Sequence, residues 1–330
     1  MYEDLVSVII TTYNSNEVFL KNAIESVLGQ TYENIEVIII DDGSTNNISK
    51  EICEKYKDKI QYYYQENKGL AGARNTGIIK SKGKYIAFLD DDDIWIEEKI
   101  SKQIDRIKEV ERRDSNVGLT FTYSIVIDEY DNYISKYGYK VEGYIFEKIL
   151  GRNIIGAPSS VLIKRNVLED VGLFNEEFRY AEDIELWYRI TKRYSVYSTN
   201  DYLIKYRFRE NSLSKNIEKM YYYTEAALLK IMQSEKNNIN IQNKRREIYD
   251  RFYLNTAYSF FSANNKVMYD KIFKILIKNN IRNIFNKKLV LGYVISIFGN
   301  GFLNELNKIR KKNKIPKAMM SIQDFTKVDK

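Results

Sequence analysis

The segment "KGKYIAFLDDDDIW", Lys82–Trp95, decides the fold, because an apolar run ends there in four consecutive aspartates. Four neighbouring carboxylates repel one another and disfavour a strand, so their place directly after "YIAFL" needs a reason. Two interpretations are open at this point: a metal site at the end of a buried strand, or an acidic turn ahead of "IWIEEKI". The segments on either side decide between them.

Short apolar runs alternate with helical patterns over the first 125 residues. We predict strands at 6–12, 35–40, 60–65 and 85–89, and helices over 17–28, 48–56 and 69–81, with Asn16 as the cap of the first helix. Repetition of strand, helix and strand predicts an α/β fold with a Rossmann-like, mostly parallel sheet flanked by helices. Ligands of such sheets collect at the carboxyl ends of the strands.

Polar clusters follow three of these strands, namely "TTYN" at 11–14, "DDGST" at 41–45 and "DDDD" at 90–93. Because the carboxyl ends of parallel strands share one edge, we expect the clusters to meet there. Carboxylate oxygens suit Mg²⁺ or Mn²⁺, and such an ion takes the rest of its shell from water and substrate phosphates. Arg74, and the later group Lys205, Arg207 and Arg209, could grip an anionic diphosphate; a surface ion pair is the alternative for Arg74.

The chain contains no histidine and one cysteine, Cys53. This composition excludes Ser-His-Asp and Cys-His mechanisms, His-ligated zinc and an intramolecular disulfide. Acid–base chemistry must fall to Asp, Glu, Lys or Tyr. The segment "AEDIELWYRI" places three acids at the start of a helix, where capping explains one of them. We therefore predict Asp183 as the general base, provided that the fold brings it to the same edge of the sheet.

The charge is divided unevenly along the 330 residues. Residues 215–330 hold 23 Lys and Arg against 9 Asp and Glu, whereas residues 1–214 hold 29 against 36. Strand patterns also end near residue 214, so we predict a catalytic domain at 1–214 and a basic, α-helical C-terminal region at 215–330. Such a region could contact a membrane or an acidic partner, or form the solvated face of helices; no nucleic-acid motif accompanies it.

Membrane signals are weak in this sequence. The first residues show no signal-peptide pattern, and the apolar run at 289–303 is shorter than the roughly 20 residues that span a bilayer. We therefore expect a cytoplasmic protein.

Together these residues resemble a family 2 glycosyltransferase of the GT-A fold over about 6–214. The resemblance rests on seven motifs in the order usual for that family: "VSVIITTYN", "SVLGQTYENIEVIIIDDGSTN", "NKGLAGARNTGI", "GKYIAFLDDDDIW", "GLFNEEF", "EDIELWYRI" and "YRFRENSLS". It implies inverting transfer of a hexosyl or N-acetylhexosaminyl group from a nucleotide sugar, most often a UDP-sugar such as UDP-GlcNAc or a UDP-hexose, to an acceptor hydroxyl. The implied cofactor is a divalent metal, Mn²⁺ or Mg²⁺.

The resemblance also implies roles for single residues on the nucleotide side. Thr11, Tyr13 and Asp42 would hold the uracil and the ribose, and Arg74 would help to hold the nucleotide. Arg207 and Arg209 would bind the diphosphate.

The metal and catalytic roles follow in the same way. Asp91 and Asp92 match the metal motif, with Asp92 the first choice of ligand, while Asp90 either binds the metal too or orients the pair. Asp183 matches the acid that deprotonates the acceptor.

Two positions depart from the pattern of that family. Asp91 stands where many relatives have serine, and Arg209 stands where many have histidine, so the metal-binding pair is open. A permanently charged guanidinium can bind diphosphate but is a poor metal ligand.

Competing functions fit less well. A phosphatase of the haloacid dehalogenase type needs D-x-D-G-[TV], and "DDGST" lacks the intervening residue. A nicotinamide dehydrogenase needs glycines after the first strand, and "TTYNSN" has none. A non-catalytic nucleotide-sugar binding module would have lost the acids, which are all present.

The acceptor is not legible from the residues. A cell-surface glycan, a lipid-linked glycan and a protein acceptor such as flagellin all fit the resemblance. Lys287, Lys288, Arg310, Lys311 and Lys312 could hold the C-terminal region against lipid headgroups at the inner face of the membrane. A helical acceptor-binding or homodimerising domain explains the same residues.

Overall fold

A computed structural model describes residues 4–209, 212, 215–286, 289–290 and 293. By its internal contacts the chain divides into two units. The first holds the described residues up to Ile149 together with Asn153–Asn216 and Tyr222–Ile231; the second holds Leu150–Arg152, Ile217–Tyr221 and the described residues from Met232 onward. The division after residue 214 that the sequence suggests stays a prediction.

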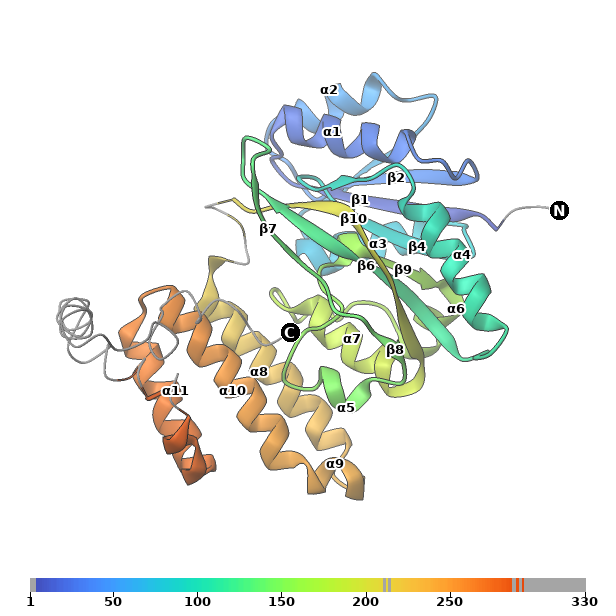
Figure 1. Ribbon diagram of the computed structural model, residues 1–330. Helices are drawn as coiled ribbons and strands as arrows, with labels where there is room; N and C mark the ends of the chain where they lie inside the picture. Colours follow the sequence, from blue (N-terminus) through green and yellow to red (C-terminus); the bar gives the residue numbers. More distant parts are fainter. Residues whose placement is uncertain (1–3, 210–211, 213–214, 287–288, 291–292, 294–330) are drawn as a thin grey trace, which may run out of the picture. The chain divides into compact units, whose positions relative to one another are not determined.

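A ten-stranded sheet forms the centre of the first unit, with the strand order β3-β2-β1-β4-β9-β6-β10-β5; β7 pairs with β6 and β8 with β10 (Figure 1). The strands are β1 (Val6–Thr12), β2 (Ile35–Asp41), β3 (Gln61–Tyr64), β4 (Tyr85–Asp90), β5 (Ile94–Trp95), β6 (Val117–Ile127), β7 (Tyr133–Tyr137), β8 (Glu142–Gly143), β9 (Val161–Lys164) and β10 (Ser195–Arg207). The pairs β1·β2, β1·β4, β2·β3 and β6·β10 are parallel, whereas β9 runs antiparallel between β4 and β6. The predicted α/β class with a mostly parallel sheet is confirmed.

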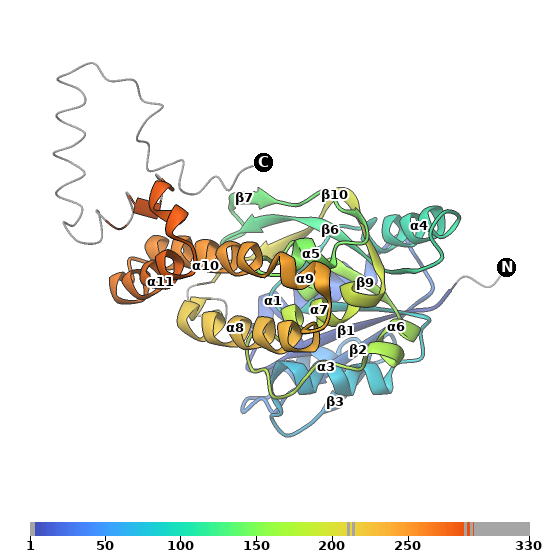
Figure 2. The same ribbon diagram turned by 90° about the horizontal axis from the view of Figure 1, so that it is seen from below.

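Helices cover both faces of this sheet. Those of the first unit are α1 (Glu17–Leu28), α2 (Ile48–Glu54), α3 (Gly69–Lys80), α4 (Lys99–Glu111), α5 (Phe146–Ile149), α6 (Arg165–Val171) and α7 (Glu182–Arg193), with the 3₁₀ turn η1 (Pro158–Ser160). Figures 1 and 2 show α1 and α2 on one side of β1 and β2, with α3 on the other. Apolar side chains of α1, α2 and α4 form one continuous core with residues of β1, β2 and β4.

The first helix begins where the sequence predicts. The side chain of Asn16 accepts hydrogen bonds from the backbone N–H groups of Val18 and Phe19 at 2.9 and 3.3 Å, which is the capping arrangement expected of asparagine. On the opposite face, α3 approaches β1 closely. A Cβ atom at Gly77 would lie 2.3 Å from Ile9 Cγ2, so glycine is required for this contact.

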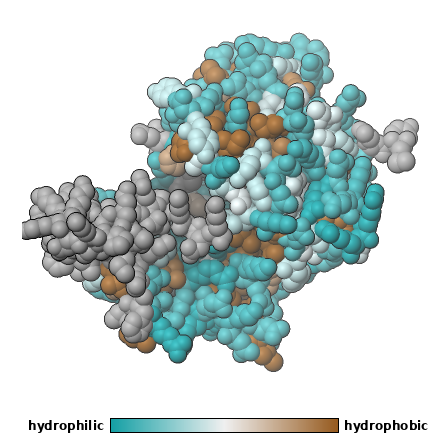
Figure 3. All heavy atoms as spheres, in the orientation of Figure 1, coloured by the Kyte–Doolittle hydropathy of each residue, from teal (hydrophilic) through white to brown (hydrophobic). Residues whose placement is uncertain are grey.

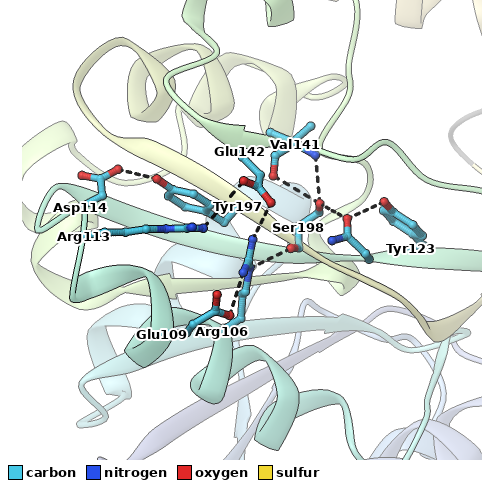
Figure 4. A network of polar contacts seen from close by, with 10 residues as sticks. Arg106, Glu109, Arg113, Asp114, Tyr123, Val141, Glu142, Tyr197 and Ser198 are labelled. Atoms are coloured by element: carbon cyan, nitrogen blue, oxygen red, sulfur yellow. Dashed lines mark hydrogen bonds and ion pairs between the residues drawn. The ribbon is translucent and has the colours of Figure 1, made fainter.

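At the end of β10 remote from the aspartates, a polar network joins α4 to β8 and β10 (Figure 4). Arg106 donates to the carbonyl of Ser198 and pairs with Glu142 at 3.0 Å, while Tyr197 donates to Asp114. Asn200 has a φ of +65°, and the pairing of β10 with β6 shifts register between Ser198 and Tyr202. The network therefore holds the irregular first part of β10 in place. The last residue of this strand, Arg207, contacts Asp93.

The described residues from 217 onward are mostly helical, as predicted. The elements are α8 (Ile217–Ser234), α9 (Ile239–Asn243), α10 (Arg245–Ser262), α11 (Lys266–Asn279) and the 3₁₀ turn η3 (Ile281–Phe285), and α8 has residues in both units. In the described part of the chain, no helix has the length and apolar character that a membrane crossing requires. The hydrophobic residues visible in Figure 3 lie in small patches amid hydrophilic surface. Lys287, Lys288, Arg310, Lys311 and Lys312 lie outside the described residues.

Candidate functional site

The carboxyl ends of β1, β2 and β4 meet at one edge of the sheet. Thr12 lies opposite Asp41 of β2, and Thr11 lies opposite Asp90 of β4. The predicted meeting of "TTYN", "DDGST" and "DDDD" is therefore confirmed. The apolar runs of β1, β2 and β4 are buried, and each ends in a polar residue. If one strand slid along its neighbour, apolar residues at one end would be exposed to water, so this register is favoured.

The residues predicted to hold the base and ribose lie at the β1 and β2 ends. Thr11 is buried, whereas the Tyr13 ring is 52% exposed and free to stack on a planar ring. Oδ1 of Asp42 accepts hydrogen bonds from Gln65 Nε2 at 2.7 Å and from the backbone N–H of Lys68 at 2.9 Å. Asp42 thus orders the loop between β3 and α3, and its nucleotide role stays a prediction.

Arg74 is buried between two acids. Its Nη2 donates to Asp90 Oδ1 at 2.7 Å and its Nη1 to Glu182 Oε1 at 2.6 Å, and its guanidinium lies 5.4 Å from the centroid of the Phe174 ring. The side chain of Arg74 is only 1% exposed. The surface ion pair considered for Arg74 is therefore wrong, because burial makes this a structural link. Direct contact between Arg74 and a nucleotide stays a prediction. To make it, Arg74 would have to give up its hydrogen bond to Asp90 or to Glu182.

The other three aspartates also have partners. Burial raises the pKa of Asp91, against hydrogen bonds from Thr12 and Ser15 that favour its ionised form. Oδ2 of Asp92 lies 2.6 Å from Arg209 Nη2. Burial and the neighbouring carboxylate of Asp91 raise the pKa of Asp92 to about 7, against the opposing effect of Arg209.

Asp93 is fully buried, and burial followed by Asp92 and Asp90 raises its pKa well above the usual range. Its Oδ1 accepts from the backbone N–H of Arg207 at 2.9 Å. Since Asp93 has no exposed surface, it is a structural residue of the turn after β4.

Arg207 and Arg209 lie beside the Phe19 ring, at 4.3 and 6.0 Å from guanidinium carbon to ring centroid. Arg207 is buried: its Nε donates to the carbonyl of Asp92 at 2.9 Å, and its Nη1 lies 2.7 Å from Asp131 Oδ1. Arg207 Nη2 and Arg209 Nε are buried and have no hydrogen-bond partner within the described ranges. Both guanidinium groups lie near the same ring, and unsatisfied cationic N–H groups suit an anion such as a phosphate oxygen.

Asp183 lies in the first turn of α7 and is partly exposed. Burial, then the neighbouring Glu182, raise the pKa of Asp183 to about 7, while Arg74 acts in the opposite direction. Ala181, before it, has a left-handed backbone with φ of +56°, a conformation that costs about 1 kcal/mol for a residue with a side chain. The strained turn brings Glu182 onto Arg74 and leaves Asp183 as a carboxylate suited to accept a proton near neutral pH.

The described carboxylates at this edge do not by themselves form a complete set of metal ligands. In the described residues, no three His, Cys, Asp or Glu side chains converge on a common point as metal ligands would. Asp92 and Asp90 can supply one or two oxygens, which fits Mg²⁺ or Mn²⁺ only when substrate phosphates complete the shell. The residues therefore fit a metal that binds together with a diphosphate.

Several residues of this edge escaped prediction as members of the site. Glu182 was grouped with the helix-capping acids, and no role was predicted for Phe19 and Ser159, although the Ser159 hydroxyl accepts from the backbone N–H of Asp90. Tyr137 of β7 also escaped prediction; burial of its hydroxyl, and then the charges of Asp93 and Asp183, raise its pKa. The tyrosines of "DNYISKYGY" could have drawn attention to this segment, but the place of Tyr137 depends on the pairing of β7 with β6.

Comparison with known proteins gives a family. The model described as glycosyl transferase family 2 matches residues 7–172, half of the chain. A putative teichuronic acid biosynthesis glycosyltransferase of Bacillus subtilis is 31% identical over 221 residues, which cover 65% of this chain and 83% of that protein. A GalNAc(5)-diNAcBac-PP-undecaprenol beta-1,3-glucosyltransferase of Campylobacter jejuni is 28% identical over 319 residues, covering 92% of this chain and 97% of that one.

A solved structure also resembles this fold. Residues 1–349 of S. aureus TarS give a TM-score of 0.51 at 16% sequence identity, over 88% of this chain and 90% of that one. This chain spans only part of several other curated relatives: the matched region makes up between 29% and 65% of their length.

Proposed function

The chain belongs to glycosyl transferase family 2, and we propose that it is an enzyme that moves a sugar from a nucleotide sugar to a hydroxyl group of an acceptor, with inversion at the anomeric carbon. The observation that carries this proposal is the position of Asp183 in the first turn of α7, next to Glu182, which Arg74 joins to Asp90. Burial raises the pKa of Asp183 to about 7, which suits it to accept a proton at neutral pH. In a chain without histidine, this carboxylate takes the role of base.

In the proposed reaction, Asp183 accepts the proton of the acceptor hydroxyl as its oxygen attacks the anomeric carbon. The bond between that carbon and the diphosphate oxygen breaks, and the diphosphate leaves with the electron pair. Attack opposite the leaving group inverts the configuration. The unsatisfied N–H groups of Arg207 and Arg209 would hold the developing negative charge, which such preorganised donors stabilise strongly.

Family 2 glycosyltransferases generally use divalent metals. We propose Mn²⁺ or Mg²⁺ here, held by Asp92 and assisted by Asp90, with Asp91 shaping the turn. When bound, the metal neutralises charge on the leaving diphosphate. Thr11, Tyr13 and Asp42 would hold the uracil and ribose of a UDP-sugar.

For the donor and acceptor we propose a UDP-hexose, with glucose as the first choice, and a glycan linked through diphosphate to a polyprenol. The support is the Campylobacter relative, whose name states a beta-1,3-glucosyl transfer to such an acceptor and which aligns across 92% of this chain. Because the lipid end would lie in a membrane, we propose that the basic C-terminal region holds the enzyme at the inner face, as a peripheral protein. A homodimer through this region, other cell-surface glycans and a protein acceptor are alternatives.

The test is a panel of nucleotide sugars, each incubated with the protein and Mn²⁺ or with chelator, followed by measurement of nucleotide release. We expect release from at least one UDP-sugar and, with a lipid-linked glycan present, a product of inverted anomeric configuration by NMR. Release of inorganic phosphate instead would support a phosphatase. Absence of nucleotide release with every donor would support a binding module and contradict the proposal.

A further inference from the structure

The ion pair between Arg209 and Asp92 has a consequence for the order of binding at this site. Arg209 Nη2 lies 2.6 Å from Asp92 Oδ2, with side-chain exposures of 33% and 13%. The other aspartates of the run are engaged elsewhere: Asp90 with Arg74, and Asp93 with the backbone of Arg207. Among the candidate metal ligands, Asp92 is therefore the one that pairs with a partly exposed arginine, Arg209.

Arg207 and Arg209 differ in how firmly they are held. Arg207 makes a hydrogen bond to Asp92 O, another to Asp128 O at 3.0 Å and an ion pair with Asp131, all while buried. Arg209 has the ion pair with Asp92 and its contact with the Phe19 ring, and a third of its side chain is exposed. Among the described residues Arg209 has this one ion pair, so its exchange for another anion would release Arg209 but not Arg207.

Electrostatics set the consequence of this difference. A divalent cation at Asp92 in the free protein would lie next to a guanidinium, and two positive charges at such distances repel strongly near a protein surface. Arginine cannot relieve this repulsion by losing a proton, whereas a histidine could. A diphosphate offers Arg209 a better partner, because its oxygens can accept from Nη2 and from the buried, unsatisfied Nε.

We propose that Arg209 competes with the divalent metal for Asp92, so that metal binds weakly to the free protein and tightly only when a nucleoside diphosphate has drawn Arg209 away. Arg209 is then a positioning residue that couples the metal to the donor. The inference rests on the proposed function, because it takes the donor to be a nucleoside diphosphate sugar. Coupling of this kind is reciprocal, so the nucleotide must bind more tightly with metal by the same factor.

The test measures metal binding and not turnover. Mn²⁺ is titrated into the full chain and the free ion is followed by electron paramagnetic resonance, first without nucleotide and then with saturating UDP. For the unmodified protein we expect UDP to tighten Mn²⁺ binding by about tenfold or more, within the usual range of coupling. For Arg209→Gln we expect Mn²⁺ alone to bind about tenfold more tightly than to the unmodified protein, and the effect of UDP to shrink.

Two further variants control the experiment. Arg209→Lys keeps the positive charge, so its nucleotide-free affinity for Mn²⁺ should stay as weak as that of the unmodified protein. Arg193→Gln removes an exposed arginine that pairs with Asp170 at 2.8 Å and should change nothing. Circular dichroism of each variant verifies the fold.

The inference would be overturned if the unmodified protein and Arg209→Gln bound Mn²⁺ with equal affinity in the absence of UDP. It would also be overturned if neither protein bound Mn²⁺, whether UDP was present or absent. Failure of the proposed function has a different signature, which is absence of UDP binding by calorimetry. In that event the nucleotide-free comparison of the two proteins still decides whether Arg209 competes for Asp92.

Discussion

Replacement of Arg74 by methionine tests the ion-pair row that supports the proposed base. Arg74 is 1% exposed and bridges Glu182, which is 8% exposed, and Asp90. Methionine keeps most of the volume but leaves a buried carboxylate without its cation, and removing one partner of a buried ion pair costs about 3–5 kcal/mol. Against a typical total of about 5–15 kcal/mol, the variant loses a large fraction of its stability.

The assay is urea unfolding followed by circular dichroism, with Arg193→Met as the matched control at an exposed ion pair. We expect a large fall in the midpoint for Arg74→Met and no measurable change for the control, because exposed pairs contribute little. The double variant Arg74→Met/Glu182→Met should recover part of the loss, since it removes the unpaired carboxylate. A loss below about 1 kcal/mol in Arg74→Met would refute the view that this row is a buried structural link.

Three further predictions concern a core lysine, a helix contact and the base. Lys99 is fully buried against Trp95 and Gln103, and burial lowers its pKa well below the usual range. Between that lowered pKa and the unfolded value of about 10.4 the unfolded chain binds more protons, so stability should rise with pH across this window. Lys99→Met should remove this dependence and raise stability at pH 7 by about 1 kcal/mol or more in thermal unfolding. Gly77→Ala should cost about 1–3 kcal/mol, because its Cβ would meet Ile9 Cγ2 at 2.3 Å; an unchanged urea midpoint would contradict this contact. The value of kcat/KM should rise with pH until about pH 7, as the Asp183 carboxyl ionises, and a flat profile between pH 5 and 8 would argue against this base.

The strands and helices of the first half of the sheet are predictable because their signals are local. The runs at 6–12 and 85–89 are continuously apolar, and both form central parallel strands within one residue of the predicted ends. Asn16 caps α1 through its own side chain, so the start of that helix is also set within a few residues. The full length of β10 could not be predicted, because the polar "STND" within it interrupts the apolar pattern while a bulge carries the strand onward.

The partners of the charged residues could not be predicted, since they lie far apart in the chain. Arg74 and Glu182 are 108 positions apart, and Arg207 and the Asp93 carboxylate that accepts from its backbone are 114 apart. A sequence places such residues at an edge of the sheet but does not distinguish an arginine that binds substrate from one that ties two acids together. The position of Tyr137 opposite Ser124 likewise depends on an antiparallel pairing that propensities do not specify.

The most direct test of the central claim is the rate of nucleotide release from the active donor in Asp183→Asn, beside Asp170→Asn as a control at an exposed acid of similar size. Asparagine keeps the shape of the side chain but cannot take a proton. We expect Asp183→Asn to lose about 100-fold or more in acceptor-dependent release, the usual contribution of a general base, while Asp170→Asn keeps its rate. Undiminished release in Asp183→Asn, with the fold intact, would contradict the assignment of Asp183 as the base.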